Sequence, residues 1–181
     1  IYSETSFPSK YGLKMELEYY TYGGNGADGI TFFLFDADAN PFNIGAFGGS
    51  LGYAQKNTTN PVSPGVSKGY IGIGLDEYGN FSNPTEGRQG GIVGPVAGGL
   101  SPSSVTIRGK GNGPDFTPEN YKYLTSVQTP SLGFSLTGGG GVRHSSPASS
   151  GYPKVLIDLQ PAPDLQTGYL ITVKILVGGA T

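Results

Sequence analysis

Residues 69–80 read GYIGIGLDEYGN, an uncharged apolar stretch followed at once by a polar turn. Isoleucine alternates with glycine here, and β-branched side chains favour a pleated strand over a helix. The stretch therefore predicts a strand over residues 69–76 that ends in a group of carboxylate and amide side chains.

Strand-like patterns recur along the whole chain, whereas helical periodicity is nearly absent. Along residues 14–19, apolar and charged side chains alternate, which is typical of a sheet with one buried face. Residues 30–36, ITFFLFD, are apolar on both faces and predict a central strand covered on both sides. The remaining predicted strands span residues 11–22, 104–108, 133–136, 154–159 and 169–177.

The composition excludes several classes of protein. Only 13% of the 181 residues are charged and the net charge is −2, so the chain lacks the basic face of a nucleic-acid binder. No apolar run is long enough to span a membrane. The absence of cysteine excludes disulfide frameworks and cysteine-ligated zinc. Thirty-two glycines and fourteen prolines instead indicate many short strands joined by turns.

Three short motifs have a chemical and a structural interpretation. GNGADG (24–29) fits a dinucleotide-binding pattern but precedes a strand, so it lacks the helix that would hold a pyrophosphate. GGSLG (48–52) fits a nucleophilic serine motif, with His144 as its only available histidine. Asp36 and Asp38 could bind Ca²⁺ outside an EF-hand, or could form a polar turn.

A polar cluster follows the strand predicted over residues 69–76. Carboxylate and amide oxygens spaced two to four residues apart suit a hard cation such as Ca²⁺. A hairpin with solvated charges explains the same spacing, so both interpretations stay open at this point. The cluster consists of Asp76, Glu77, Asn80, Asn83 and Glu86.

Three stretches in series resemble one family. GADGITFFLF (26–35), FGGSLGY (47–53) and IGIGLDEYGN (71–80) are similar, in order and spacing, to the strand entry, glycine loop and metal-binding loop of L-type (legume-lectin-like) lectins. The similarity is closest to the lectin-like modules of large bacterial surface adhesins. It covers most of residues 6–177.

The resemblance implies a set of polar sugar contacts. Asp28, after a cis peptide bond from Ala27, would accept hydrogen bonds from two sugar hydroxyls. The backbone N–H of Gly49, with Gly48 beside it, would donate to the sugar. Asn80 would contact the sugar through one atom of its amide.

Aromatic rings are implied beside these polar groups. The ring of Tyr78 would lie against the sugar. Tyr53, Phe47 and Phe81 are expected to flank the same site.

The resemblance also implies Ca²⁺, with two departures from the family pattern. Asp76, the carbonyl of Tyr78 and the other amide atom of Asn80 would hold the ion, and Glu86 could substitute for a further family carboxylate. Gly74 stands where the family has its first metal-binding acid, and residues 88–92, RQGGI, lack the expected histidine. We therefore expect no transition metal.

Together these features predict an all-β fold, an antiparallel β-sandwich of the concanavalin-like jelly-roll type. We expect a single lectin-like domain over residues 1–181, truncated at one or both ends as a fragment of a longer chain. Another chain or segment is expected to complete a sheet edge.

The function expected from the resemblance is glycan binding by a bacterial adhesin, at the cell surface or secreted. The alternative is a structural spacer that kept the fold without the site. We expect no enzymatic activity, because the paired acids of a glycoside hydrolase on this fold are missing. We also expect no nucleic-acid partner and no membrane insertion.

Overall fold

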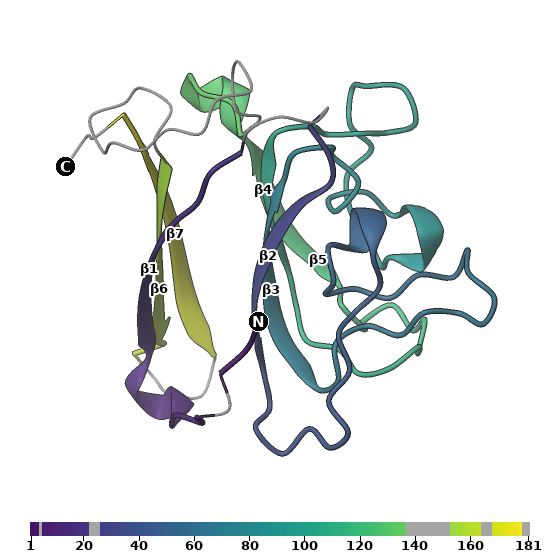
Figure 1. The fold of residues 1–181 in the computed structure, drawn as a ribbon, viewed down its shortest axis with the longest axis vertical. Coiled ribbons are helices and arrows are strands. Elements are labelled where there is room, and N and C mark those ends of the chain that lie inside the picture. Colours follow the sequence, from purple (N-terminus) through teal and green to yellow (C-terminus); the bar gives the residue numbers. More distant parts are fainter. Residues whose placement is uncertain (4, 22–25, 137–152, 164–167, 179–181) are drawn as a thin grey trace. The chain divides into compact units, whose positions relative to one another are not determined.

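The computed structural model of the chain describes residues 1–3, 5–21, 26–136, 153–163 and 168–178 (Figure 1). These residues form two antiparallel sheets joined by long loops and short 3₁₀ turns, with no α-helix among them. The predicted all-β class is therefore confirmed. Within the described part of the chain, no helix is long and apolar enough to cross a membrane.

Seven strands and four 3₁₀ turns make up the described elements. The strands are β1 (Leu13–Glu18), β2 (Gly29–Phe35), β3 (Gly69–Asp76), β4 (Ser104–Arg108), β5 (Tyr123–Gln128), β6 (Pro153–Pro161) and β7 (Tyr169–Val177). The 3₁₀ turns are η1 (Ser9–Tyr11), η2 (Gly48–Ser50), η3 (Thr85–Gly87) and η4 (Thr129–Leu132).

The chain divides into two compact units, each with one sheet. The first combines Ile1–Gly23 with Gly138–Thr181, and the second is Gly24–Thr137. Each unit is described by itself. The single domain, the jelly-roll connectivity and the completion of a sheet by another chain or segment stay predictions.

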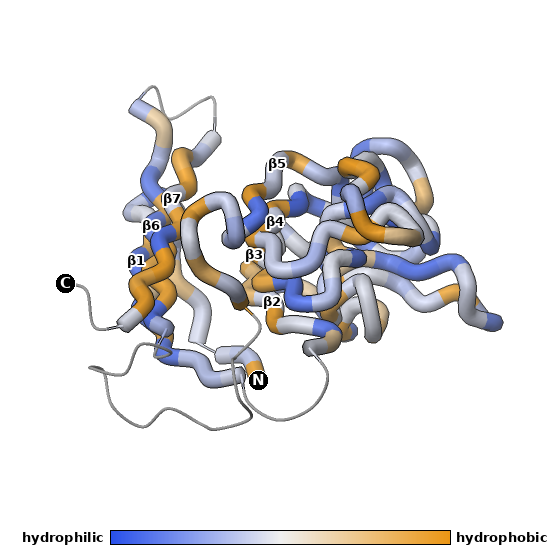
Figure 2. The backbone as a smooth tube through the Cα atoms, turned by 90° about the horizontal axis from the view of Figure 1, so that it is seen from above, coloured by the Kyte–Doolittle hydropathy of each residue, from blue (hydrophilic) through white to orange (hydrophobic). Residues whose placement is uncertain are grey.

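The sheet of the first unit has the strand order β1-β6-β7. Apolar residues pair across β1 and β6, with Met15 opposite Ile157 and Leu17 opposite Val155. Burial alternates along β1 and β6, as the sequence predicts, and Figure 2 shows alternating hydrophobic and hydrophilic segments along these strands. This alternation fixes the register, because a slip of one residue would expose every apolar side chain.

The sheet of the second unit has the order β2-β3-β4-β5. The prediction of a central strand over residues 30–36 is wrong, because β2 lies at the end of this order and most of its residues are half-buried. β3 is the strand buried along most of its length.

Two other strand predictions differ from the structure. Residues 133–136 form no strand: Gly133 takes a φ of 88°, and its N–H donates to the Pro130 carbonyl to close the turn after η4. β5 was not predicted, because its polar and exposed residues weaken the apolar alternation.

Two glycines on β3 leave room for aromatic rings of the core of the second unit. A Cβ on Gly72 would lie 2.4 Å from the ring of Tyr53, and a Cβ on Gly74 would lie 2.4 Å from the ring of Phe81. Both rings are fully buried, and Tyr53 also packs edge-on against Tyr121. The rings therefore rest directly on the backbone of β3, which no larger residue would allow.

The loop between β3 and β4 is tied to the sheet by Arg108, the last residue of β4. Its side chain is fully buried and donates to five backbone carbonyls. These belong to Phe81 (2.8 Å), Asn83 (3.0 Å), Gln89 (2.9 Å), Gly90 (3.3 Å) and Tyr121 (3.0 Å). One side chain thus satisfies carbonyls that would otherwise be buried without donors.

We expect Arg108→Lys to lower the free energy of unfolding by about 3 kcal/mol, because an ammonium has three donors and leaves buried carbonyls unpaired. Urea denaturation measures this change. The control is Lys110→Met at an exposed position nearby, with an expected change within about 0.5 kcal/mol. A fall of under about 1 kcal/mol for Arg108→Lys would contradict the anchoring role.

Candidate functional site

The start of β2 and the end of β3 bring two predicted site segments together. Gly29 pairs with Asp76, and the carbonyl of Asp28 accepts the N–H groups of Glu77 and Tyr78, each at 3.1 Å. The peptide bond between Ala27 and Asp28 is cis, as the resemblance implies. Asp28 therefore lies directly beside the turn that carries Tyr78.

The glycine loop contacts the same turn. A Cβ on Gly49 would lie 2.4 Å from Cβ of Asn80 and 3.0 Å from its Cγ, so the backbone of Gly49 packs against the Asn80 side chain. Three segments that are distant in the sequence thus bring Asp28, Gly49 and Asn80 to one region of the second unit.

Two polar groups of this region, the Asp28 carboxylate and the Gly49 N–H, form no hydrogen bond within the described part of the chain. Asp28 is exposed, and its carboxylate forms no hydrogen bond or ion pair with the described residues. The N–H of Gly49 likewise has no acceptor among them. The charged acceptor of Asp28 is therefore available to a ligand, and the donor of Gly49 lies at a buried residue beside it in the same region.

The aromatic residues divide into two groups. Tyr78 is 43% exposed and Phe47 is 67% exposed, and Nζ of Lys56 lies 4.8 Å from the centre of the Phe47 ring. The prediction that Tyr53 and Phe81 flank the site is wrong, because both belong to the buried core on β3.

Asp76 is fully buried, and backbone donors occupy both of its carboxylate oxygens. Gly79 N–H donates to Oδ1 at 2.8 Å and Phe81 N–H to Oδ2 at 2.7 Å. Burial raises the pKa of Asp76 to about 6, although these two hydrogen bonds and the charge of Arg88 favour the ionised form. The carboxylate thus shapes the turn from Asp76 to Phe81.

Glu86 forms ion pairs with two cationic side chains. Its Oε1 accepts from Nζ of Lys56 and its Oε2 from Nη1 of Arg88, both at 2.8 Å. Burial opposes ionisation, but the hydrogen bonds and charges of Lys56 and Arg88 outweigh it and lower the pKa of Glu86. Among the described residues, no group of three or more acidic, histidine or cysteine side chains could hold a metal ion. Ca²⁺ binding stays a prediction.

The other motifs have local structural roles. Asp38 pairs with Nζ of Lys68 at 2.6 Å, and its N–H donates to Asp36 Oδ1, as in a polar turn. The hydroxyl of Ser50 donates to the Gln55 carbonyl, and Ser50 is the last residue of the short turn η2, so no helix begins directly after it. His144 lies outside the described residues.

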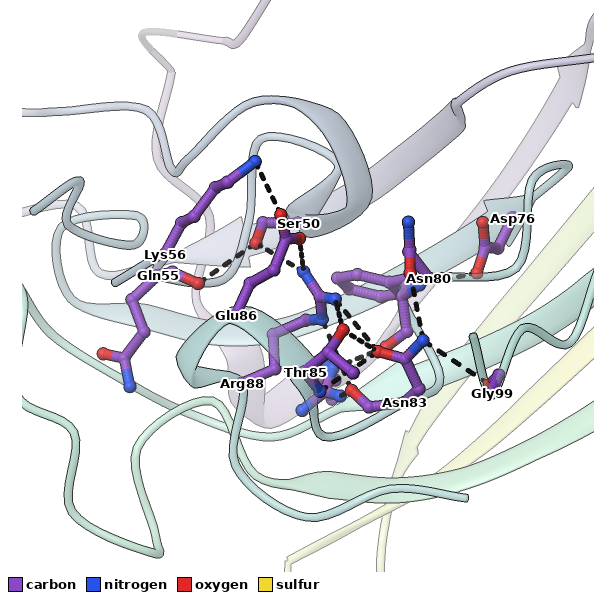
Figure 3. Close-up of polar contacts among 12 residues, drawn as sticks. Ser50, Gln55, Lys56, Asp76, Asn80, Asn83, Thr85, Glu86, Arg88 and Gly99 are labelled. Atoms are coloured by element: carbon purple, nitrogen blue, oxygen red, sulfur yellow. Dashed lines mark hydrogen bonds and ion pairs between the residues drawn. The ribbon is translucent and has the colours of Figure 1, made fainter. Parts of the chain in front are cut away.

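Arg88 is a residue of the site that the sequence analysis did not identify (Figure 3). Asn83 was expected only as part of a polar cluster, and its side-chain oxygen accepts from Arg88. Arg88 is 2% exposed and lies 3.2 Å from where a Cβ on Gly49 would be. The available signal was a lone arginine where the lectin pattern has histidine. Its burial could not be foreseen, because arginine is rarely fully buried unless paired, and the polar residues that precede it in the sequence fit an exposed turn equally well.

Comparison of the chain with models of known families, with curated proteins and with solved structures finds no match.

We expect the free energy of unfolding to depend on pH through the titration of Asp76. Its pKa in the folded chain, about 6, lies above the ordinary value of 3.8. The folded state therefore binds the proton more tightly, and the stabilisation is present below about pH 4 and lost as the pH rises through about 6. The difference in unfolding free energy between the wild type and Asp76→Asn should fall by about 2–3 kcal/mol over this range.

Urea denaturation at a series of pH values measures this difference. If the difference instead grows as the pH rises, the backbone donors and Arg88 outweigh burial, and the raised pKa is wrong.

Proposed function

We propose that the chain is a carbohydrate-binding module, of the kind that its resemblance to the L-type lectins of bacterial adhesins implies. The observation that carries this proposal is the meeting of Asp28, Gly49 and Asn80, which come from three segments of the chain. The proposed partner is a glycan outside the cell or at the bacterial surface.

The chemistry of the three groups suits a sugar. Each hydroxyl of a sugar is both a donor and an acceptor, and the site offers a charged acceptor in Asp28, a backbone donor in Gly49 and an amide in Asn80. The exposed ring of Tyr78 could cover the apolar C–H face of a pyranose. This combination of polar groups and one ring supports binding rather than bond cleavage.

We expect Asp28→Asn to weaken glycan binding at least about tenfold, because it removes a charged acceptor. A glycan array with the wild type and the variant measures the change. The control is Asp36→Asn, the same exchange at an exposed position beyond the opposite end of β2. Equal array signals for Asp28→Asn and the wild type would contradict the assignment of Asp28. A wild type that binds no glycan would favour the structural-spacer alternative.

We expect Gly49→Ala to weaken binding by a similar factor, because the added Cβ would lie 2.4 Å from Asn80 and displace its amide. The same array measures the effect, and thermal unfolding checks that the variant is folded. The control is Gly109→Ala, where a Cβ would make only ordinary contacts of 3.5 Å or more with Leu124. Undiminished binding by Gly49→Ala would show that this loop does not face the ligand.

A further inference from the structure

The side-chain oxygens predicted to hold Ca²⁺ are all engaged by N–H donors. A Ca²⁺ ion takes six to eight oxygen ligands, and an N–H group pointing at an oxygen competes with the cation. Figure 3 shows Asp76 and Glu86 on opposite sides of Asn80, so the two carboxylates do not converge. The engaged oxygens are Oδ1 and Oδ2 of Asp76, Oδ1 of Asn80, and Oε1 and Oε2 of Glu86.

The position of the family's first metal-binding acid is also filled. Position 74 is glycine, and the buried ring of Phe81 lies where a side chain at this position would begin, 2.4 Å from the Cβ site. The guanidinium of Arg108 also lies over this ring, with its Cζ 5.4 Å from the ring centre. A carboxylate at position 74 would therefore collide with the core, and the residues present do not fit a bound metal.

A guanidinium stands at the centre of this loop instead. All five N–H donors of Arg88 reach oxygen atoms (Figure 3). Nε donates to the Asn83 carbonyl at 3.3 Å, and Nη1 donates to Ser50 Oγ at 3.2 Å and Glu86 Oε2 at 2.8 Å. Nη2 donates to Asn83 Oδ1 at 3.0 Å and Thr85 Oγ1 at 2.7 Å. This shell of five oxygens around a buried positive charge is comparable to a cation site.

The shell also fixes the orientation of the Asn80 amide. Asn83 Oδ1 accepts from Arg88 and from the N–H and hydroxyl of Thr85, so its Nδ2 is left to donate. Nδ2 donates to Asn80 Oδ1 at 3.0 Å. The NH₂ group of Asn80 therefore points away from Asn83, as Figure 3 shows, and can donate to a ligand.

We propose that Arg88, acting through Asn83, takes the positioning role of a bound cation, so that the saccharide site keeps its geometry without Ca²⁺. This inference rests on the proposed function for the identity of the ligand. Its account of the loop does not depend on that ligand. Arg88 and Asn83 are positioning residues, because they act on the ligand through Asn80.

The first test titrates the wild-type chain with CaCl₂ and measures binding heat and thermal unfolding, with EDTA as the reference. We expect no saturable heat, and melting temperatures in 5 mM CaCl₂ and in EDTA that agree within about 1 °C, because only a ligand of the folded state stabilises it. Saturable Ca²⁺ binding with a melting temperature raised by several degrees, and lost in Asp76→Asn, would overturn the proposal.

The second test uses Asn83→Asp, which keeps the acceptor for Arg88 but removes the donor to Asn80. We expect the Asn80 amide to turn, which shifts its side-chain NH₂ signals in a ¹⁵N-resolved NMR spectrum. The matched control, Asn43→Asp, changes an exposed asparagine whose Nδ2 lies 3.4 Å from Ser67 Oγ and should leave these signals in place. Unmoved Asn80 signals in a folded Asn83→Asp variant would overturn the proposal.

A glycan array in EDTA then separates this inference from the proposed function. We expect the wild type to bind in EDTA and Asn83→Asp to lose at least about tenfold in signal. Wild-type binding that requires Ca²⁺ would overturn the inference while supporting a lectin. The wild type could instead bind no glycan, with or without Ca²⁺, while the first two tests give the expected results. That outcome would contradict the proposed function and would still support the role of Arg88 in holding the loop.

Discussion

Two buried guanidinium groups hold the loop between β3 and β4, and the candidate site depends on this interaction. Arg88 and Arg108 both donate to the carbonyl of Asn83, at 3.3 and 3.0 Å. Two buried like charges are unfavourable: burial and the nearby charge of Arg88 lower the pKa of Arg108 to about 9. The pair is tolerated because every donor finds an oxygen and because Glu86 and Asp76 supply negative charge.

This arrangement divides the polar residues of the region into two sets. The carboxylates of Asp76 and Glu86 face inward, where one shapes a backbone turn and the other neutralises cations. Asp28 keeps an exposed carboxylate with no partner among the described residues. The inward set makes the loop rigid, and the outward set can meet a ligand without first giving up internal contacts, which reduces the cost of binding.

The features that the sequence predicted correctly depend on local patterns. Alternation identified β1 and β6, and the isoleucine–glycine run identified β3. The apolar run of β2 was misinterpreted, since Phe33 and Phe35 are apolar because they pack on the aromatic cluster rather than because the strand is central. Arg88 was missed because most of its acceptors lie on Asn83, Thr85 and Glu86, and such a run of polar neighbours fits an exposed turn equally well. Its remaining acceptor, Ser50, is distant in the sequence and shows no local pattern.

The most direct test of the central claim is an NMR titration of the ¹⁵N-labelled wild-type chain with monosaccharides in EDTA. The account predicts saturable shifts of the Gly49 amide and the Asn80 side-chain NH₂ without added Ca²⁺. Shifts that appear only after Ca²⁺ is added would contradict the metal-free site. Saturable shifts at other residues, with the Gly49 and Asn80 signals unmoved, would contradict the location of the binding site.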